Sequence, residues 1–203
     1  MTEESTGAVL GTTSFHDILP AVKRGNVPYR PVEDFSPVTN LVVTPCYLAV
    51  NPAKLDVKTV AELVAYARAN PEKLNFGSSG IGTSLHLAME LFMQAAGIRM
   101  THVPFKGGGP AVIALVSGET QAQVASIGEL IAHIKTNRVR ALGVTTLQRV
   151  AQLPDVPTIA DSFPGYESWT WVSVFAPAGT PRPIIDRLNA EIGKAMSDPD
   201  TAS

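Results

Sequence analysis

The fold is decided by one stretch near the middle of the chain, Leu74-Asn75-Phe76-Gly77-Ser78-Ser79-Gly80-Ile81-Gly82-Thr83-Ser84-Leu85-His86-Leu87. It predicts the end of an apolar strand, then a glycine-rich turn, then the beginning of a helix. The glycines of the turn permit positive φ angles, which residues with side chains disfavour. Apolar residues then recur at helical spacing as far as Ala96, and Gly97 stands where a helix C-cap is expected.

The glycine-rich turn has the properties of an anion-binding site. A turn at a helix N-terminus directs unpaired backbone N–H groups and the positive end of the helix dipole toward one point. Hydroxyl side chains add further donors: Ser78, Ser79, Thr83 and Ser84. The residues therefore indicate a site for a carboxylate or phosphate group. An ordinary strand-to-helix turn with a Ser or Thr N-cap uses the same residues, so the local sequence leaves both interpretations open.

Composition limits the classes of function. The chain has 203 residues, 45% of them hydrophobic, and a formal net charge of -2. This is enough chain for a substantial core, and the near-neutral charge gives no reason to expect a nucleic acid or an anionic membrane as partner. The only cysteine, Cys46, lies in an apolar segment and is expected to be a buried thiol. The acidic residues 1–6 predict no signal peptide.

Strands and helices are expected to alternate along the chain. Strands are predicted at residues 38–50, 74–76, 100–105, 120–125, 139–145 and 169–176. Helices are predicted at residues 15–23, 59–69, 83–96, 111–117, 128–135 and 183–196. This alternation indicates an α/β fold with mostly parallel sheets, in which ligands bind at the carboxyl ends of strands. Small-residue turns at 11–14, 77–83 and 106–110 each follow a strand and are candidates to line one site.

Common catalytic motifs are not met. Ile81 stands where a G-x-S-x-G nucleophile elbow requires its last glycine, and no P-loop or complete dinucleotide fingerprint occurs. The histidines are widely scattered, without metal-binding spacing. We therefore expect no catalytic residue, no cofactor and no metal. A serine hydrolase using Ser78 or Ser79 is an alternative, but no obvious base stands near either serine in the sequence. Lys106 is either a ligand-pairing cation or a solvated loop lysine.

A set of short motifs spans nearly all of the chain from residue 8 onward. They include Gly11-Thr12-Thr13-Ser14-Phe15-His16, Val27-Pro28-Tyr29, the stretch 74–87, His102-Val103-Pro104-Phe105-Lys106-Gly107, the stretch 153–158 and Phe175-Ala176-Pro177-Ala178-Gly179-Thr180-Pro181. In this order they resemble the periplasmic solute-binding proteins of tripartite tricarboxylate transporters, also called the Bug family.

The resemblance implies a periplasmic-binding-protein-like fold of type II, in which two α/β lobes close on a ligand by a hinge. Residues 1–50 with 166–203 would form lobe 1, and residues 51–165 would form lobe 2. The family's first strand, its first binding turn and its C-terminal closing segment have no counterpart here. We therefore expect a chain truncated at both ends, with an incomplete first lobe whose exposed edges favour self-association.

The resemblance also implies a carboxylate site built mainly from backbone amides and hydroxyl groups. The expected ligand-binding residues are Ser78, Ser79, Gly80, Gly82, Thr83, Thr13, Ser14, Ala125, Ser126 and Lys106. Some family members have an aspartate at the position of Ala125, which suits the ammonium group of an amino acid. The alanine here indicates a ligand without that cation, such as a dicarboxylate, a tricarboxylate or an aromatic acid.

The resemblance thus predicts an extracytoplasmic solute-binding protein, not an enzyme, that captures a small carboxylate for a tripartite tricarboxylate transporter. Its partners would be the membrane subunits of that transporter, and its location would be the periplasm. Two alternatives on the same fold stay open. One is an intracellular carboxylate sensor, although no DNA-binding segment is evident, and the other is a remnant that no longer binds a ligand.

Overall fold

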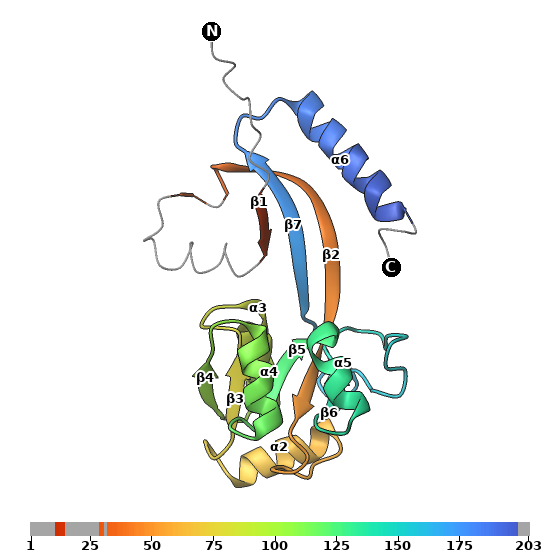
Figure 1. Cartoon of the computed structure of the whole chain (residues 1–203). Helices are drawn as coiled ribbons and strands as arrows, with labels where there is room; N and C mark the ends of the chain where they lie inside the picture. The colour runs from red at the N-terminus through yellow and green to blue at the C-terminus, as the bar shows by residue number, and fades with distance from the viewer. Residues whose placement is uncertain (1–10, 15–28, 31, 199–203) are drawn as a thin grey trace. The chain divides into compact units, whose positions relative to one another are not determined.

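The computed structural model describes residues 11–14, 29–30 and 32–198 (Figure 1). The chain divides into two compact units. We call residues 44–170 the middle unit, and residues 1–43 with 171–203 the terminal unit. Strands β2 (Phe35–Val50) and β7 (Trp169–Pro177) each contribute residues to both units.

The middle unit is built on a mixed β-sheet. Its strands in spatial order are β6 (Arg140–Val144), β2, β5 (Ala122–Ser126), β3 (Asn75–Ser78) and β4 (Thr101–Pro104). β3 is parallel to β4 and β5, as expected for an α/β fold, whereas β2 is antiparallel to β5 and β6. β2 is the exception: its last residue, Val50, pairs with the first residue of β5, Ala122, so the two strands run in opposite directions.

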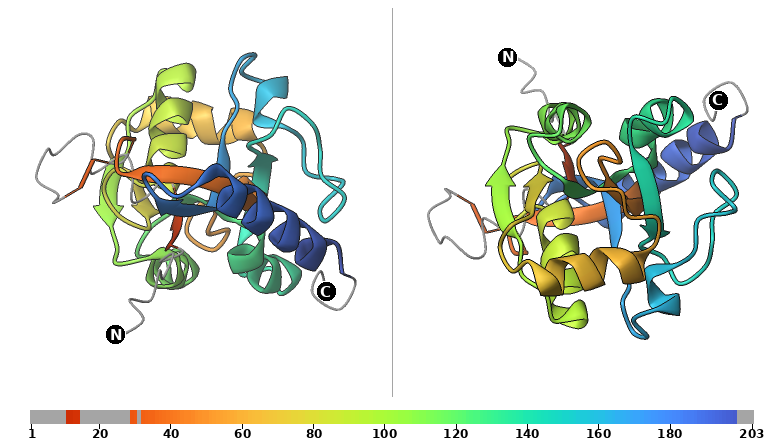
Figure 2. Two further views of the ribbon diagram at one scale, coloured as in Figure 1. Left: turned by 90° about the horizontal axis from the view of Figure 1, so that it is seen from above. Right: turned by 90° about the horizontal axis from the view of Figure 1, so that it is seen from below.

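Helices cover both faces of this sheet. They are α2 (Val60–Ala69), α3 (Ser84–Ala96), α4 (Gly108–Ser117) and α5 (Ile127–Lys135). α2 and α3 lie on one side of the sheet, and α4 and α5 lie on the other (Figure 2). Successive residues of β2 point into these two layers: Leu48 belongs to the core with Phe76, and Tyr47 belongs to the core with Leu115.

Local capping residues explain where the helices begin and end. Thr59 is the N-cap of α2, and its side chain accepts from the backbone N–H of Glu62 at 3.1 Å. Gly97 ends α3 in the left-handed conformation, with φ 62°. Both caps confirm the boundaries predicted from the sequence. A short 3-10 helix, η1 (Ile159–Asp161), follows β6 in the chain.

The terminal unit contains β1 (Gly11–Ser14), the outer part of β7 and helix α6 (Arg182–Ser197). Residues 11–14 were expected to form a turn, but they form a strand that is antiparallel to β7. Residues 11–14 form a strand because they pair with β7, which is distant in the sequence. No local sequence pattern predicts this pairing. The helix expected at 15–23 lies outside the described residues. Ile185 of α6 packs against Val38, Val174 and Ala176.

Among the described residues, no helix is both long and apolar enough to cross a lipid bilayer.

Candidate functional site

The candidate site lies in the middle unit, at the edge where the parallel strands β3, β4 and β5 end. We call it the carboxyl edge and define it by the strand ends Ser78, Pro104 and Ser126. Helices α3, α4 and α5 each begin within a few residues of these ends. Their N-termini therefore lie at the carboxyl edge, where ligands of parallel sheets bind.

The glycine-rich turn at this edge is shaped by two glycines and one threonine. Gly80 has φ 139° and Gly82 has φ 82°, values that residues with side chains adopt only with strain. Thr83 is the N-cap of α3, and its Oγ1 accepts from the backbone N–H of His86 at 3.3 Å. The same Oγ1 donates to the carbonyl of Gly80 at 2.8 Å, so the threonine closes the turn on itself.

Internal acceptors already occupy most amides of this turn. The N–H of Gly80 donates to Ser78 Oγ at 3.1 Å, and the N–H of Gly82 donates to His86 Nδ1 at 3.2 Å. The N–H of Thr83 donates to the carbonyl of Gly80 at 3.3 Å. These amides were expected to hold the ligand, and in the structure they hold the turn in its shape.

Two amides without an acceptor lie one and two residues further on. Within the described part of the chain, the backbone N–H groups of Ser84 and Leu85 donate to no acceptor. They occupy the first two positions of α3, where an α-helix has no internal partner for its N–H groups. No acidic residue lies in the first turn of this helix. The pair therefore offers donors and a positive dipole end to an anion.

Sequence reasoning did not single out the amides of Ser84 and Leu85. A signal was nevertheless present, because an N-cap threonine satisfies the amide at the third helical position and leaves the first two free. Both residues are 6% exposed.

A histidine pair lies behind the turn and was also missed. His102 Nε2 is 2.6 Å from Ser78 Oγ, and the His102 ring stacks on His86 with centroids 4.1 Å apart. Phe76 stacks against both rings, 4.8 Å from His102 and 6.1 Å from His86. Burial, and then the neighbouring His86, lower the pKa of His102 to about 4. His102 is therefore a neutral ring near pH 7.

The contact between Ser78 and His102 bears on the hydrolase alternative. The sequence showed no base near Ser78, and the structure places one within hydrogen-bonding distance. However, Ser78 is fully buried, and its Oγ donates its one hydrogen to the carbonyl of Gly80 at 3.2 Å, which leaves His102 Nε2 as the donor to Ser78 Oγ. A catalytic serine needs an exposed Oγ at which a substrate can bind. The contact thus supports the shape of the turn.

The loop after β4 lies directly beside the turn. The N–H of Phe105 donates to the carbonyl of Ser78 at 3.0 Å, and the N–H of Gly107 donates to the carbonyl of Ser79 at 3.1 Å. Lys106 stands between these two bonds, and its side chain is exposed. Among the described residues, its ammonium group forms no ion pair. The structure therefore brings this cation next to the turn.

The remaining expected site residues have different surroundings. Ala125 is fully buried, opposite Tyr47 in the sheet. Ser126 uses both its N–H and its Oγ to donate to Glu129 Oε2, at 3.2 and 2.8 Å. Thr13 and Ser14 belong to the terminal unit, in β1. Within the described residues, no group of three or more metal-binding side chains occurs.

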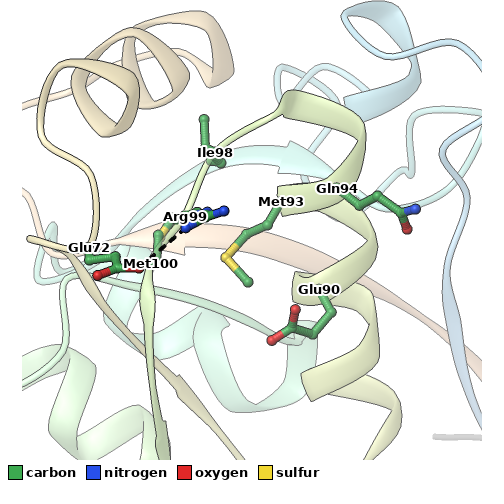
Figure 3. Close-up of a pocket in the computed structure, with 7 residues that line it drawn as sticks. All are labelled: Glu72, Glu90, Met93, Gln94, Ile98, Arg99 and Met100. Atoms are coloured by element: carbon green, nitrogen blue, oxygen red, sulfur yellow. Dashed lines mark ion pairs between the residues drawn. The ribbon is translucent and has the colours of Figure 1, made fainter.

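A hollow lies away from the turn, where α3 ends and β4 begins (Figure 3). Its volume is about 430 Å³, and it is lined by Glu72, Glu90, Met93, Gln94, Ile98, Arg99 and Met100. Arg99 faces Glu72 across 3.9 Å, so the positive charge already has a carboxylate nearby. The hollow is not lined by Ser84 or Leu85 and does not belong to the candidate site.

Comparison with known proteins gives one consistent family. The model described as "Tripartite tricarboxylate transporter family receptor" matches residues 8–203. The chain is 47% identical over 176 residues to a protein encoded in the tcbD-tcbE intergenic region of Pseudomonas sp. strain P51, covering 86% of this chain and 52% of that one. It is 34% identical to protein BugT of Bordetella pertussis, covering 84% and 52%. The chain thus spans about half the length of these relatives.

Solved structures confirm the expected periplasmic-binding-protein-like fold of type II. An R. palustris protein solved with adipate has a TM-score of 0.83 and 33% identity, covering 95% of this chain and 64% of that one. MatC of Rhodopseudomonas palustris, solved with bound malate, has a TM-score of 0.83 and 30% identity, covering 95% and 66%.

Proposed function

Because the chain belongs to the tripartite tricarboxylate transporter receptor family, we propose that it is a solute-binding protein that captures a small carboxylate in the periplasm. It would hand this acid to the membrane subunits of a tripartite transporter without changing it chemically. The observation that supports the proposal most directly is the pair of unpaired N–H groups on Ser84 and Leu85, at the beginning of α3.

The ligand class follows from the neighbouring structures and from one position in β5. Two similar proteins are described with adipate and with malate, which are both dicarboxylates. Ala125 is fully buried and has no charge to pair with an ammonium group. We therefore expect a dicarboxylate, a tricarboxylate or an aromatic acid, rather than an amino acid. Lys106 would contribute a positive charge beside the anion.

We also propose that the two compact units correspond to the two lobes expected from the family. The boundaries of the units fall within β2 and β7, close to the expected boundaries at residues 50 and 166. Thr13 and Ser14 would then belong to lobe 1, and the glycine-rich turn to lobe 2. Self-association of the chain stays a prediction, to be measured by its sedimentation behaviour.

The decisive experiment removes one backbone N–H group. Ser84→Pro deletes the amide at the first position of α3, where proline is well tolerated in helices. The preceding residue, Thr83, has φ -71° and ψ 160°, an extended conformation that suits a residue before proline. The matched control, Ser84→Ala, removes the hydroxyl group, which lies 3.3 Å from Thr170 Oγ1, but keeps the amide.

Binding is measured by calorimetry and by thermal shift against adipate, malate, citrate and benzoate. We expect at least one acid to bind the wild-type chain and the alanine variant alike, and the proline variant to bind it about tenfold or more weakly, since a charged hydrogen bond contributes about 1.5–3 kcal/mol. Equal affinity of the proline and alanine variants would refute the amide site. If none of the four acids binds the wild-type chain, the proposed capture of these acids is refuted.

A further inference from the structure

A protein carboxylate lies at the beginnings of two helices on the carboxyl edge. Glu129 belongs to the first turn of α5, and its Oε2 accepts from both the N–H and the Oγ of Ser126. Its Oε1 lies against Gly108, the first residue of α4, so closely that a Cβ added there would be 1.7 Å from this oxygen. One side chain thus lies at the N-termini of α4 and α5 together.

The beginning of α3 differs from those of α4 and α5. Neither α3 nor α4 has an acidic residue in its own first turn, but the carboxylate of Glu129 lies beside Gly108 of α4. Among the described residues, no acceptor is bonded to the N–H groups of Ser84 and Leu85. Three helices therefore direct their positive ends toward the same edge, and the carboxylate of Glu129 lies beside two of these ends.

We infer that Glu129 is a specificity-determining residue, which fills the anion positions of α4 and α5 so that the middle unit accepts one external carboxylate, at α3. This inference rests on the proposed function. The negative charge of Glu129 repels a second carboxylate close to the first. The protein therefore favours acids whose carboxylates are well separated, such as adipate, over compact polycarboxylates such as citrate.

The charge of Glu129 acts on other groups of this edge as well. Cys46 lies opposite Ser126 in the sheet. Burial raises the pKa of the Cys46 thiol to about 12, and the Glu129 carboxylate contributes in the same direction.

The test uses three variants of the whole chain. Glu129→Ala removes the carboxylate. Glu129→Gln removes its charge and keeps an acceptor for Ser126, which protects the helix cap if the alanine variant folds poorly. Gly108→Ala keeps the glutamate at position 129. The added methyl group takes the position of Oε1, so it displaces the carboxylate by steric contact. Backbone amide signals are followed by NMR during titration with adipate, citrate and inorganic sulfate.

In the wild-type chain, we expect adipate to shift the amide signals of Ser84 and Leu85, with little change at Gly108 and Ser126. In Glu129→Ala, sulfate and citrate should shift Gly108 and Ser126 as well, and citrate affinity should rise about three- to tenfold as the repulsion is lost. Glu129→Gln should show the rise in citrate affinity, and Gly108→Ala should resemble Glu129→Ala.

Two results would overturn the inference. One is a wild-type chain in which sulfate shifts Gly108 as strongly as Ser84. The other is a folded set of Glu129 variants in which sulfate shifts neither Gly108 nor Ser126 and citrate affinity stays unchanged. Failure of the proposed function gives a different pattern, because adipate would then leave Ser84 and Leu85 unshifted in every variant while sulfate still reports whether Glu129 blocks α4.

Discussion

Thr83 Oγ1 takes part in three hydrogen bonds of the candidate site, so the Thr83 hydroxyl is the most informative group to remove. Oγ1 accepts from the His86 N–H at 3.3 Å, accepts from Ser79 Oγ at 3.1 Å and donates to the Gly80 carbonyl at 2.8 Å. Thr83→Val keeps the volume and the branched shape of the side chain but loses all three hydrogen bonds.

The size of the effect follows from which groups lose their partner. The Gly80 carbonyl retains Ser78 Oγ at 3.2 Å and the Thr83 N–H at 3.3 Å, so it stays satisfied. The His86 N–H and the Ser79 Oγ each lose Thr83 Oγ1 as acceptor, and the loss of a helix N-cap costs about 1 kcal/mol. Replacing the hydroxyl in a site that is 7% exposed adds little more, because the methyl groups of valine are apolar. We expect the free energy of unfolding to fall by about 1–2 kcal/mol.

Urea unfolding, followed by circular dichroism and extrapolated linearly to water, measures this difference. The matched control is Thr83→Ser, which restores the oxygen and should lie within about 0.5 kcal/mol of the wild-type chain. The same series should show carboxylate affinity falling in the valine variant, because the amides of Ser84 and Leu85 follow the capped turn. A valine variant as stable as the serine variant would show that this oxygen does not hold the turn.

Two further predictions concern the interior of the middle unit. The pKa of His102 is about 4 in the folded chain, against 6.5 for an unperturbed histidine. The unfolded state therefore binds a proton first as the pH falls, and stability should drop between about pH 6.5 and 4, by about 1–2 kcal/mol after allowance for the partly exposed ring. Urea unfolding at pH 7.5 and 4.5 should show a smaller drop in His102→Gln than in the wild-type chain, and equal drops would contradict the assignment. Gln123 is fully buried, and no hydrogen-bond partner for its Oε1 or Nε2 exists among the described residues. Gln123→Met should therefore raise the free energy of unfolding by about 1 kcal/mol in the same urea assay, whereas a loss would reveal a buried partner such as an ordered water.

Helix boundaries could be predicted from the sequence because the residues that signal them are close together in the chain. The Thr59 and Thr83 caps, and the glycine at position 97, involve residues within four positions of one another. The strand β1 was missed because its partner β7 lies far away in the chain. The same difference applies to the site. Residues 78–83 are close in the chain and form one turn, as predicted. His102 belongs to β4, and no local sequence pattern predicts its contact with Ser78.

By itself, the sequence determined that this chain has an α/β fold with a glycine-rich turn leading into a capped helix, and it determined the family. Only the tertiary structure decided where the protein's own side chains lie against the amides of the carboxyl edge. His86 reaches back to Gly82 while stacked on His102, and Glu129 of α5 lies against Gly108 of α4. The physical reason is that an amide is available to a ligand only when no side chain of the protein occupies it, and the side chains that do so are positioned by packing between distant segments.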